Sequence, residues 1–349
     1  MRTSDFDYSL PPELIAQVPI EPRDAARMLV MHRQSRTLEH RHFIDLPDYL
    51  VPGDVLVLNR TRVIPARIWA RKVPSGGKLE LLLLRRLQSD TWEALVRGRR
   101  ARPGSRLELI DPTAGEIGPE LELLQIMPSG ARVVRFLQPA ETWLRRHGQT
   151  PLPPYIHEHL ADPERYQTVF GDSDGSAAAP TAGLHFTPRV LDAIRGKGVQ
   201  IEEVTLHIGL DTFRPIKAEH VEDHAIHSEW CDLPEDVASR LSLARAEGRR
   251  VVAVGTTAVR VLESAAAKAT RLGATTTYTA YQGETSLYIV PGYRFLGVDA
   301  LLTNFHLPRS TLLLLVSAFA GREFVLGAYA EAIRERYRFF SFGDCCLIL

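Results

Sequence analysis

Residues 250–271 read RVVAVGTTAVRVLESAAAKATR, and this stretch decides the fold class. Arg250–Val254 is a β-branched run typical of a buried strand, Gly255-Thr-Thr257 reads as a connecting loop, and Ala258–Arg271 reads as a helix. The alternation extends in both directions, with a strand expected over Gln200–Ile208 and helices over Pro188–Lys197, Glu235–Gly248, Leu312–Phe319 and Gly321–Tyr337. It predicts an α/β fold in which helices cover a mainly parallel sheet.

A second pattern occupies residues 60–145. Turn signals such as Pro103-Gly104 separate short runs rich in strand formers, which are Val63–Ala70, Leu79–Leu84, Trp92–Val96, Arg106–Ile110, Leu121–Ile126 and Arg132–Leu137. This spacing predicts a small β-barrel. Because Val55–Leu58 also reads as a strand of the larger sheet, we expect a discontinuous α/β domain of residues 1–59 and 146–349 with a basic β-barrel domain, residues 60–145, inserted in it.

The composition of the 349 residues is globular, with 45% hydrophobic and 24% charged residues. Its three cysteines form no disulfide framework and no zinc-type spacing. The longest apolar run, from Leu312 to Ala320, is far shorter than the roughly 20 residues that span a bilayer, and the N-terminus lacks the apolar segment of a signal peptide. We therefore expect a soluble, cytoplasmic protein with no membrane association.

The 42 basic and 42 acidic residues cancel over the whole chain, but they are unevenly distributed. Between Arg60 and Arg106, thirteen basic residues stand against three acidic ones, with Trp69 and Trp92 interleaved. Such a surplus on a small barrel favours the phosphate backbone of a nucleic acid as the partner. A solvated charged surface is the alternative interpretation.

Three loops combine a histidine with small or polar neighbours. They are Pro180-Thr-Ala-Gly-Leu-His-Phe-Thr187, Thr205-Leu-His-Ile-Gly209 and Thr303-Asn-Phe-His-Leu-Pro308. Open α/β sheets bind their ligands in the loops at the carboxyl ends of parallel strands, so these histidines are candidates for a ligand site. The alternative for each of them is a hydrogen-bonded packing residue.

Two further segments are weighed separately. In His224-Ala-Ile-His227-Ser-Glu229 the H-x-x-H spacing would place two imidazoles on one face of a helical turn. A zinc site needs further ligands that are missing nearby, so an acid–base or orienting role is favoured over a metal. The other interpretation of this segment is a solvated start of a helix.

The segment Gly255-Thr-Thr257 would aim backbone N–H groups at an anion, or it would serve only as a helix cap. It lacks both common nucleotide-binding fingerprints.

Taken in order, these segments resemble one family over nearly the full length, the S-adenosylmethionine:tRNA ribosyltransferase-isomerases of queuosine biosynthesis. The resemblance rests on Asp5-Phe-Asp7, Leu58-Asn59 with Thr61-Arg-Val-Ile-Pro-Ala-Arg67, Pro151-Leu-Pro-Pro-Tyr-Ile156, Ala179-Pro-Thr-Ala-Gly-Leu-His-Phe-Thr187, Val204-Thr-Leu-His-Ile-Gly209, Glu222-Asp-His224 with His227-Ser-Glu229, Ala253-Val-Gly-Thr-Thr257, Thr303-Asn-Phe-His-Leu-Pro308 and Arg336-Tyr-Arg-Phe339. Two positions depart from the family pattern, Arg60 and Ser286.

The resemblance implies an α/β domain with an inserted β-barrel, and a reaction in which S-adenosylmethionine donates its ribosyl group. The acceptor is a tRNA that carries 7-aminomethyl-7-deazaguanine at the wobble position, and the products are epoxyqueuosine-tRNA, adenine and methionine. A base removes a proton from the carbon next to the sulfonium, and adenine then departs. Histidines suit such proton transfers, and the chemistry needs no metal and no cofactor beyond the co-substrate S-adenosylmethionine.

From the resemblance we derive three groups of candidate site residues, each stated as a hypothesis. The catalytic candidates are His185, His207, His306, His224, His227 and Glu229. The candidates for binding substrate or donor are Thr181, Gly183, Gly209, Thr212, Gly255, Thr256, Thr257, Arg260 and Asn304, with the Gly255–Thr257 loop and Arg260 facing the donor's methionine carboxylate. The candidates for tRNA phosphate contacts are Arg62, Arg67, Arg97, Arg99 and Arg100.

Two other function classes remain open at this point. One is a tRNA-binding protein without activity, and the other is a conventional methyltransferase that uses the same donor. Adenine release separates both from ribosyl transfer. We expect a monomer, since one tRNA and one donor need only one active site.

Overall fold

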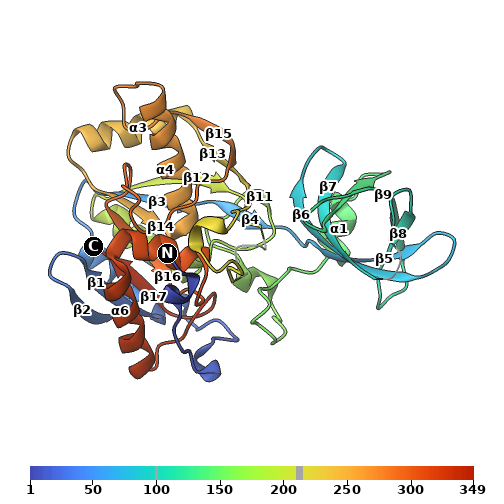
Figure 1. The fold of residues 1–349 in the computed structure, drawn as a ribbon, viewed down its shortest axis with the longest axis horizontal. Coiled ribbons are helices and arrows are strands. Elements are labelled where there is room, and N and C mark those ends of the chain that lie inside the picture. The colour runs from blue at the N-terminus through green and yellow to red at the C-terminus, as the bar shows by residue number, and fades with distance from the viewer. Residues whose placement is uncertain (99–100, 210–214) are drawn as a thin grey trace. The chain divides into compact units, whose positions relative to one another are not determined.

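The computed structural model describes residues 1–98, 101–209 and 215–349, and it separates into two compact units (Figure 1). The first, here called the α/β unit, consists of Met1–Thr61, Pro153–Ser173 and Ala179–Leu349. The second, the barrel unit, consists of Arg62–Leu152 and Asp174–Ala178. The chain therefore leaves the α/β unit after Thr61 and builds most of the barrel unit before it returns.

The α/β unit is built on a nine-stranded sheet, counted over the described residues, in the order β15-β13-β12-β3-β14-β16-β17-β1-β2. The strands are β1 (Arg27–His32), β2 (Thr37–His42), β3 (Val55–Asn59), β12 (Gln200–Leu206), β13 (Glu229–Leu233), β14 (Val251–Val254), β15 (Tyr281–Thr285), β16 (Ala300–Asn304) and β17 (Cys345–Ile348).

The sheet is mixed, which refines the expectation of a mainly parallel one. The four central strands β12, β3, β14 and β16 run parallel to one another. On one side of them β13 is antiparallel to β12 and β15 is antiparallel to β13, and on the other side β17 is antiparallel to β16. The α/β fold class is confirmed, and the central parallel strands keep four carboxyl ends at one edge of the sheet.

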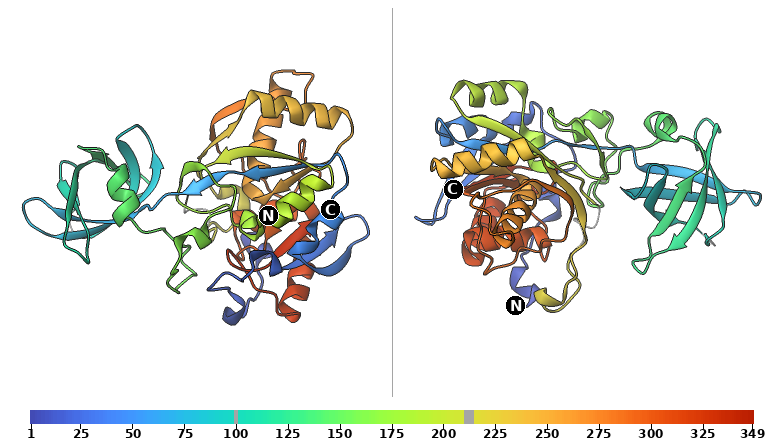
Figure 2. Two further views of the ribbon diagram at one scale, coloured as in Figure 1. Left: turned by 180° about the vertical axis from the view of Figure 1, so that it is seen from behind. Right: turned by 90° about the horizontal axis from the view of Figure 1, so that it is seen from above.

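Helices cover both faces of this sheet (Figures 1 and 2). On one face, α2 (Pro188–Gly196) and the 3₁₀ helix η4 (Phe43–Tyr49) pack on alternate side chains of the central strands, such as Leu56, Val252 and Leu302. On the other face α4 (Gly255–Arg271) lies across the central strands and contacts α5 (Thr311–Ala320), which packs on α6 (Arg322–Arg334). The strand residues are therefore buried on both sides and form a near-continuous apolar run, as parallel strands require.

The barrel unit is a closed six-stranded antiparallel barrel in the order β10-β7-β6-β5-β8-β9. Its strands are β5 (Arg67–Lys72), β6 (Lys78–Arg86), β7 (Thr91–Arg97), β8 (Arg106–Ile110), β9 (Ile117–Ile126) and β10 (Arg132–Phe136), followed by helix α1 (Glu141–His147). Side chains alternate between interior and solvent along β6, where Leu79, Leu81 and Leu83 are buried. This period of two is the pattern that the sequence showed.

The remaining elements are short or peripheral. They are β4 (Thr61–Val63) and β11 (Ser173–Ser176), which form a two-stranded sheet, helix α3 (Glu235–Ala246), and the 3₁₀ helices η1 (Thr3–Phe6), η2 (Pro12–Leu14), η3 (Arg23–Ala25), η5 (Pro163–Tyr166), η6 (Thr181–His185) and η8 (Val221–Asp223). Of the described helices none is by itself long and apolar enough to cross a membrane, and the pair α5–α6, which would be long enough together, is bent by 112°.

Candidate active site at the carboxyl edge of the sheet

The four parallel strands bring most of the predicted site residues to one edge, here called the carboxyl edge. Thr61 follows the end of β3, His207 follows β12, Gly255 follows β14, and Asn304 ends β16. Strand β13 starts at the same edge because it is antiparallel to β12 and pairs with its last residues. Segments far apart in sequence thus meet where open α/β sheets bind ligands.

A buried carboxylate lies at the centre of this edge. Glu229 is 3% exposed and pairs with the guanidinium of Arg260, which reaches it from the second turn of α4. One of its oxygens, Oε1, also accepts the backbone N–H of Gly209 at 2.9 Å and lies 3.3 Å from His227 Nε2. Glu229 therefore ties three elements of the edge together.

The charge of Glu229 is fixed by these neighbours. Burial by itself would raise the pKa of this carboxyl group. The positive charge of Arg260, the hydrogen bond from His227 and the Gly209 N–H outweigh burial and lower the pKa of Glu229 to about 2. At neutral pH the group is a carboxylate, so it accepts hydrogen bonds and donates none.

His207 is held by contacts on two sides. Its Nδ1 lies 2.8 Å from the hydroxyl of Thr61, and its ring stacks on Trp230 with centroids 5.1 Å apart and an interplanar angle of 18°. The Asn59 side chain fixes the strand end beneath it, donating to the Leu206 carbonyl and accepting the Leu206 N–H, both at 3.0 Å. The orientation of this imidazole is therefore set by the fold.

His185 lies deeper, at the end of η6. Its Nε2 is 3.2 Å from the Asn304 amide, and Asn304 in turn accepts the Thr181 hydroxyl at 2.9 Å. Burial, and then the charges of Arg338 and Arg23, lower the pKa of His185 to about 4, so the ring is neutral at pH 7. Gly183 allows this turn to approach Phe170, since a Cβ there would lie 2.8 Å from the ring.

His306 is also buried, but its contacts point to a packing role. Its Nε2 lies 2.9 Å from the Thr303 hydroxyl, and its backbone N–H donates to Tyr329 at 3.0 Å. Burial lowers the pKa of His306 to about 3. Its carbonyl accepts the hydroxyl of Tyr8, so His306 secures the loop after β16.

The His224–Glu229 segment is not a helical turn, which corrects the geometry expected from its H-x-x-H spacing. His224 directly follows η8, and the chain from 224 to 228 has no regular structure before β13 begins. His224 packs edge-on against Tyr288, whereas His227 reaches Glu229, because an irregular chain does not align positions i and i+3. Among the described residues, no group of three or more metal-ligating side chains is found.

The Gly255-Thr-Thr257 segment is the first turn of α4, not a loop before it. Gly255 has a φ of +83°, a conformation that turns the strand directly into the helix. Within the described chain the helix start has no side-chain cap, and two buried polar atoms have no hydrogen-bond partner, Thr257 Oγ1 and Arg260 Nε. Both residues are more than 90% buried.

The expected tRNA contacts divide into three groups. Arg62 and Arg67 lie beside acids, at 4.0 Å from Asp174 and 3.4 Å from Glu80. Arg97 ends β7 and is exposed. The predictions on Arg99, Arg100 and the donor-site residue Thr212 fall outside the described residues.

The two ends of the barrel differ in how their charges are matched. At the end that contains helix α1 the basic side chains sit in ion pairs, such as Arg85 with Glu93 and Arg86 with Glu141. The opposite end, here called the basic rim, carries Lys72, Lys78, Arg97, Arg102, Arg106 and Arg132, at strand ends or in the β7–β8 loop. Within the described chain, Lys78, Arg97 and Arg106 form no ion pair.

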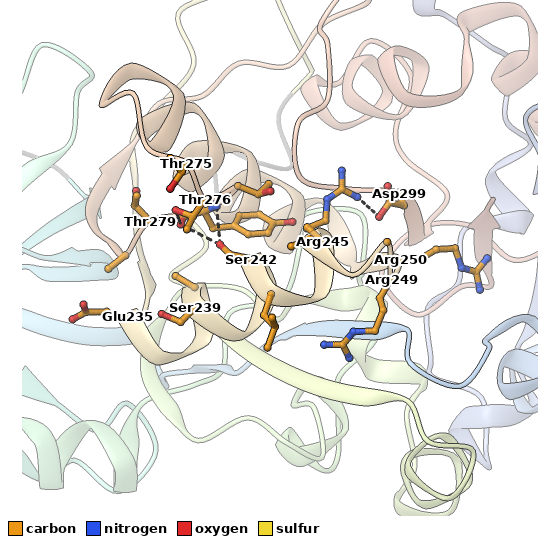
Figure 3. Close-up of a pocket in the computed structure, with 17 residues that line it drawn as sticks. Glu235, Ser239, Ser242, Arg245, Arg249, Arg250, Thr275, Thr276, Thr279 and Asp299 are labelled. Carbon is orange, nitrogen blue, oxygen red and sulfur yellow. Dashed lines mark hydrogen bonds and ion pairs between the residues drawn. The ribbon is translucent and has the colours of Figure 1, made fainter.

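A hollow of about 950 Å³ lies elsewhere, beside α3 and the segment 275–280 (Figure 3). Its arginines are already used inside the protein: Arg245 pairs with Asp299, and Arg250 pairs with Asp54. Arg250 and Asp299 precede β14 and β16, so this hollow is at the opposite edge of the sheet from Glu229. None of the predicted site residues lines it.

Sequence reasoning did not single out Asn59, Thr61 or Trp230 as members of the site. The available signal was Asn59-Arg-Thr61, two short polar side chains directly after a buried strand, the position at which the other strands carry candidate residues. Arg60 between them pairs with Asp172 at 3.2 Å. Nothing in the local sequence connects Thr61 with His207, which is 146 residues away.

Comparison with known proteins agrees with this architecture of a mixed α/β sheet and an inserted barrel. The family model described as "Queuosine biosynthesis protein" matches residues 3–348. The S-adenosylmethionine:tRNA ribosyltransferase-isomerases of Moorella thermoacetica and Symbiobacterium thermophilum are 54% and 52% identical to the chain, over the full length of both partners. A crystal structure of the S-adenosylmethionine tRNA ribosyltransferase from Thermotoga maritima is 40% identical, with a TM-score of 0.56, and the match covers 99% of this chain and 100% of that one.

These matches identify the class of enzyme that shares this fold and the family to which the chain belongs. The fold, a central parallel α/β sheet interrupted by a closed barrel, is shared with an enzyme class that transfers a ribosyl group to tRNA. The chain belongs to the queuosine biosynthesis protein family.

Proposed function

We propose that this protein transfers the ribosyl group of S-adenosylmethionine to 7-aminomethyl-7-deazaguanine at the wobble position of tRNA and isomerises it. The products are epoxyqueuosine-tRNA, adenine and methionine. The observation that carries the proposal is the Glu229–Arg260–His227–Gly209 cluster, next to His207, at the carboxyl edge of a chain of this family. It supplies a fixed negative charge and two imidazoles in one place, which proton transfer needs.

The proposed roles follow from burial. His207 and His227 are only partly buried and serve the proton transfers. His185 and His306 are buried and neutral at pH 7, and they hold the loops that follow the strands. His224 supports the segment that carries His227 through its contact with Tyr288.

The start of α4 is the proposed site for the donor's methionine carboxylate. Its first N–H groups have no partner within the helix and attract an anion. The support is the pair of buried, unpartnered atoms on the first two turns, Thr257 Oγ1 and Arg260 Nε. The two nitrogens at the tip of Arg260 already donate, one to Glu229 and the other to the Thr285 carbonyl, whereas Nε has no hydrogen-bond partner among the described residues.

The basic rim is the proposed contact for tRNA phosphates. Exposed cations that are not matched by neighbouring acids gain most from a polyanion, because binding releases the counterions of the nucleic acid. Lys78, Arg97 and Arg106 are exposed and are therefore the main proposed phosphate contacts. Arg62 and Arg67 are weaker candidates than the sequence suggested, because they already lie beside acids.

The decisive experiment is adenine release from S-adenosylmethionine by the purified protein, with and without tRNA that carries the aminomethyl-deazaguanine. Adenine that appears only with the modified tRNA is the expected result. S-adenosylhomocysteine as the product would indicate methyl transfer instead. If the protein bound tRNA but released neither adenine nor S-adenosylhomocysteine, it would be a tRNA-binding protein without this activity.

We also propose that the protein works as a monomer in the cytoplasm and needs no metal or further cofactor. Light scattering of the purified protein should give a mass near 39 kDa. Adenine release should be unchanged after treatment with a chelator. A rate that is restored by one divalent cation would overturn the last point.

A further inference from the structure

Three arginines bring positive charge to one place at the carboxyl edge of the α/β unit. They are Arg23 in η3, Arg165 in η5 and Arg338, which lies between α6 and β17. Burial is the main cause of the lowered pKa of Arg23, and the charge of Arg165 is the second. At His185 burial is again the main cause of the lowered pKa, followed by the charges of Arg338 and Arg23. Segments far apart in the sequence thus form one positive region beside His185.

Backbone carbonyl groups hold two of these guanidinium groups in place. Arg23 donates to the carbonyls of Gln167 and Glu164, and Arg338 donates to the carbonyl of Val18. Both arginine side chains are partly exposed. A carbonyl group positions a guanidinium but does not neutralise it, and each guanidinium has five N–H groups, so both remain able to bind an anion.

Arg165 has a carbonyl and an acid as partners. It donates to the carbonyl of Ile20 at 2.8 Å and pairs with Glu21 at 2.5 Å. The side chain of Glu21 is 73% exposed, so this ion pair is weak and an anion can compete with it. The acids that act on Arg23 each act more weakly than Arg165 does, and they are Glu21, Asp162 and Glu164.

A small hollow lies among these side chains. Its lining includes Arg23, Arg165, His185 and Ser341, and its volume is about 20 Å³. A cavity needs roughly 10–15 Å³ to hold a water molecule. The hollow therefore admits one oxygen atom and is too small for a nucleobase or a ribose.

The imidazole that lines the hollow is a neutral donor. The amide nitrogen of Asn304 is identified by its contact with the Phe340 carbonyl at 3.3 Å, because a carbonyl only accepts. The same nitrogen donates to Nε2 of His185 at 3.2 Å, so the N–H of this ring is on Nδ1. A neutral N–H group among fixed cations is suited to an anionic oxygen.

We propose that this hollow and its three arginines, here called the arginine cup, bind one oxygen of a backbone phosphate in the anticodon loop of tRNA. The inference rests on the proposed function and adds to it a place on the α/β unit where the RNA backbone is held. The target base must reach the carboxyl edge, and its flanking phosphates come with it. Guanidinium groups match the geometry of phosphate oxygens.

The carboxylate of the donor offers the same oxygen chemistry as a phosphate. The donor has one carboxylate, and the start of α4, with its unpartnered Thr257 hydroxyl, is the site already proposed for it. The arginine cup is therefore assigned to the RNA, and the experiments below distinguish the two sources.

The first test measures the affinity of the full-length protein for an anticodon stem–loop RNA that carries the aminomethyl-deazaguanine. Arg165→Gln should weaken binding by about 10-fold, the effect of one charge-assisted hydrogen bond. Glu21→Gln should strengthen binding by about 2- to 5-fold, because it removes the acid that competes with the phosphate. A damaged fold does not bind more tightly, so the second variant separates charge from structure.

Arg195→Gln is the matched control for the loss of one positive charge. Arg195 is exposed, pairs with Asp192 at 3.2 Å and lies near the end of α2, on the way to the start of β12. This variant should bind the RNA like wild type. Unchanged affinity in both Arg165→Gln and Glu21→Gln would show that the hollow holds only water, and would overturn the inference.

The second test locates the phosphate. A methylphosphonate removes the charge of one linkage, and it is placed at each linkage of the anticodon loop in turn. With wild type, one linkage should cost about 10-fold in affinity, and at that linkage Arg165→Gln should show no further loss. Equal losses in wild type and variant at every linkage would show that no phosphate is bound by the cup.

The third test separates phosphate from carboxylate. Calorimetry should give the same affinity for S-adenosylmethionine with wild type and Arg165→Gln. A weaker donor affinity beside an unchanged RNA affinity would assign the cup to the donor carboxylate and overturn the inference. RNA binding is measured without adenine release, so a wild-type protein that shows the coupled linkage but releases no adenine would count against the proposed function alone.

Discussion

The carboxyl edge of the α/β unit and the basic rim of the barrel use charge in opposite ways. At the edge, Glu229 and Arg260 are almost completely buried and are matched by each other and by backbone groups. On the rim, Lys78, Arg97 and Arg106 are exposed. Buried charges must be paired, and the pairing fixes side chains in place, whereas exposed charges stay available for a partner. The edge is therefore suited to chemistry and the rim to reversible binding of a polyanion.

Glu229→Gln is expected to have the largest effect. The amide keeps the shape of the side chain but removes the charge that matches Arg260 and orients His227. Adenine release should fall by about 100-fold or more, as when the orienting acid of a catalytic triad is replaced by its amide. The measurement is the single-turnover rate with saturating donor and modified tRNA, and a rate within about threefold of wild type would contradict the role of the carboxylate.

Removing charge from the rim should weaken tRNA binding without affecting the edge. The triple variant Lys78→Ala, Arg97→Ala, Arg106→Ala should reduce the slope of log affinity against log salt by up to about 3, one for each phosphate that is no longer neutralised. The rate at saturating tRNA should stay close to wild type. Arg86→Ala is the matched control, since Arg86 is paired with Glu141 at the other end of the barrel. If Arg86→Ala lowered the salt slope per removed charge as much as the triple variant does, the two ends of the barrel would not differ in tRNA binding.

Thr257→Val tests the helix start within the edge. Loss of one hydrogen bond to the donor carboxylate should raise KM for S-adenosylmethionine by about 5- to 10-fold and leave kcat nearly unchanged. Thr270→Val is the control on the same helix, because its hydroxyl bonds to the Ala266 carbonyl one turn earlier. A donor analogue without the carboxylate should bind both Thr257→Val and wild type equally; a difference would place the carboxylate elsewhere.

Acidification should destabilise the α/β unit through its buried histidines. The pKa of His185 is lowered to about 4 and that of His306 to about 3, so between these values and about 6.5 the unfolded chain binds protons that the folded protein does not. Stability is therefore lost as the pH falls through this window, by about 1.4 kcal/mol per pH unit for each histidine. Urea unfolding at pH 7 and 5 measures it, and His185→Asn should show a shallower dependence than wild type.

Much of the fold was predictable because its signals are local. The strand periods of the barrel, the β-branched run of β14 and the glycines and prolines between the elements are properties of neighbouring residues. The α4 boundary was misplaced because a glycine followed by two threonines is typical of a loop, and only the packed strand before it allows the helix to begin at Gly255. The strands that run against the central ones, β13 and β17, were missed because strand direction is set by pairing and not by composition.

The sequence by itself determined which residue types reach the carboxyl edge, since histidines, threonines and glycines follow the parallel strands in chain order. It did not determine which of them touch. The H-x-x-H spacing suggested that His224 and His227 act together, yet His227 pairs with Glu229, and Glu229 pairs with Arg260 on a different element. Tertiary structure decided these contacts, because burial forces each charge and each hydroxyl to find a partner across the sheet, and those partners are far apart in the chain.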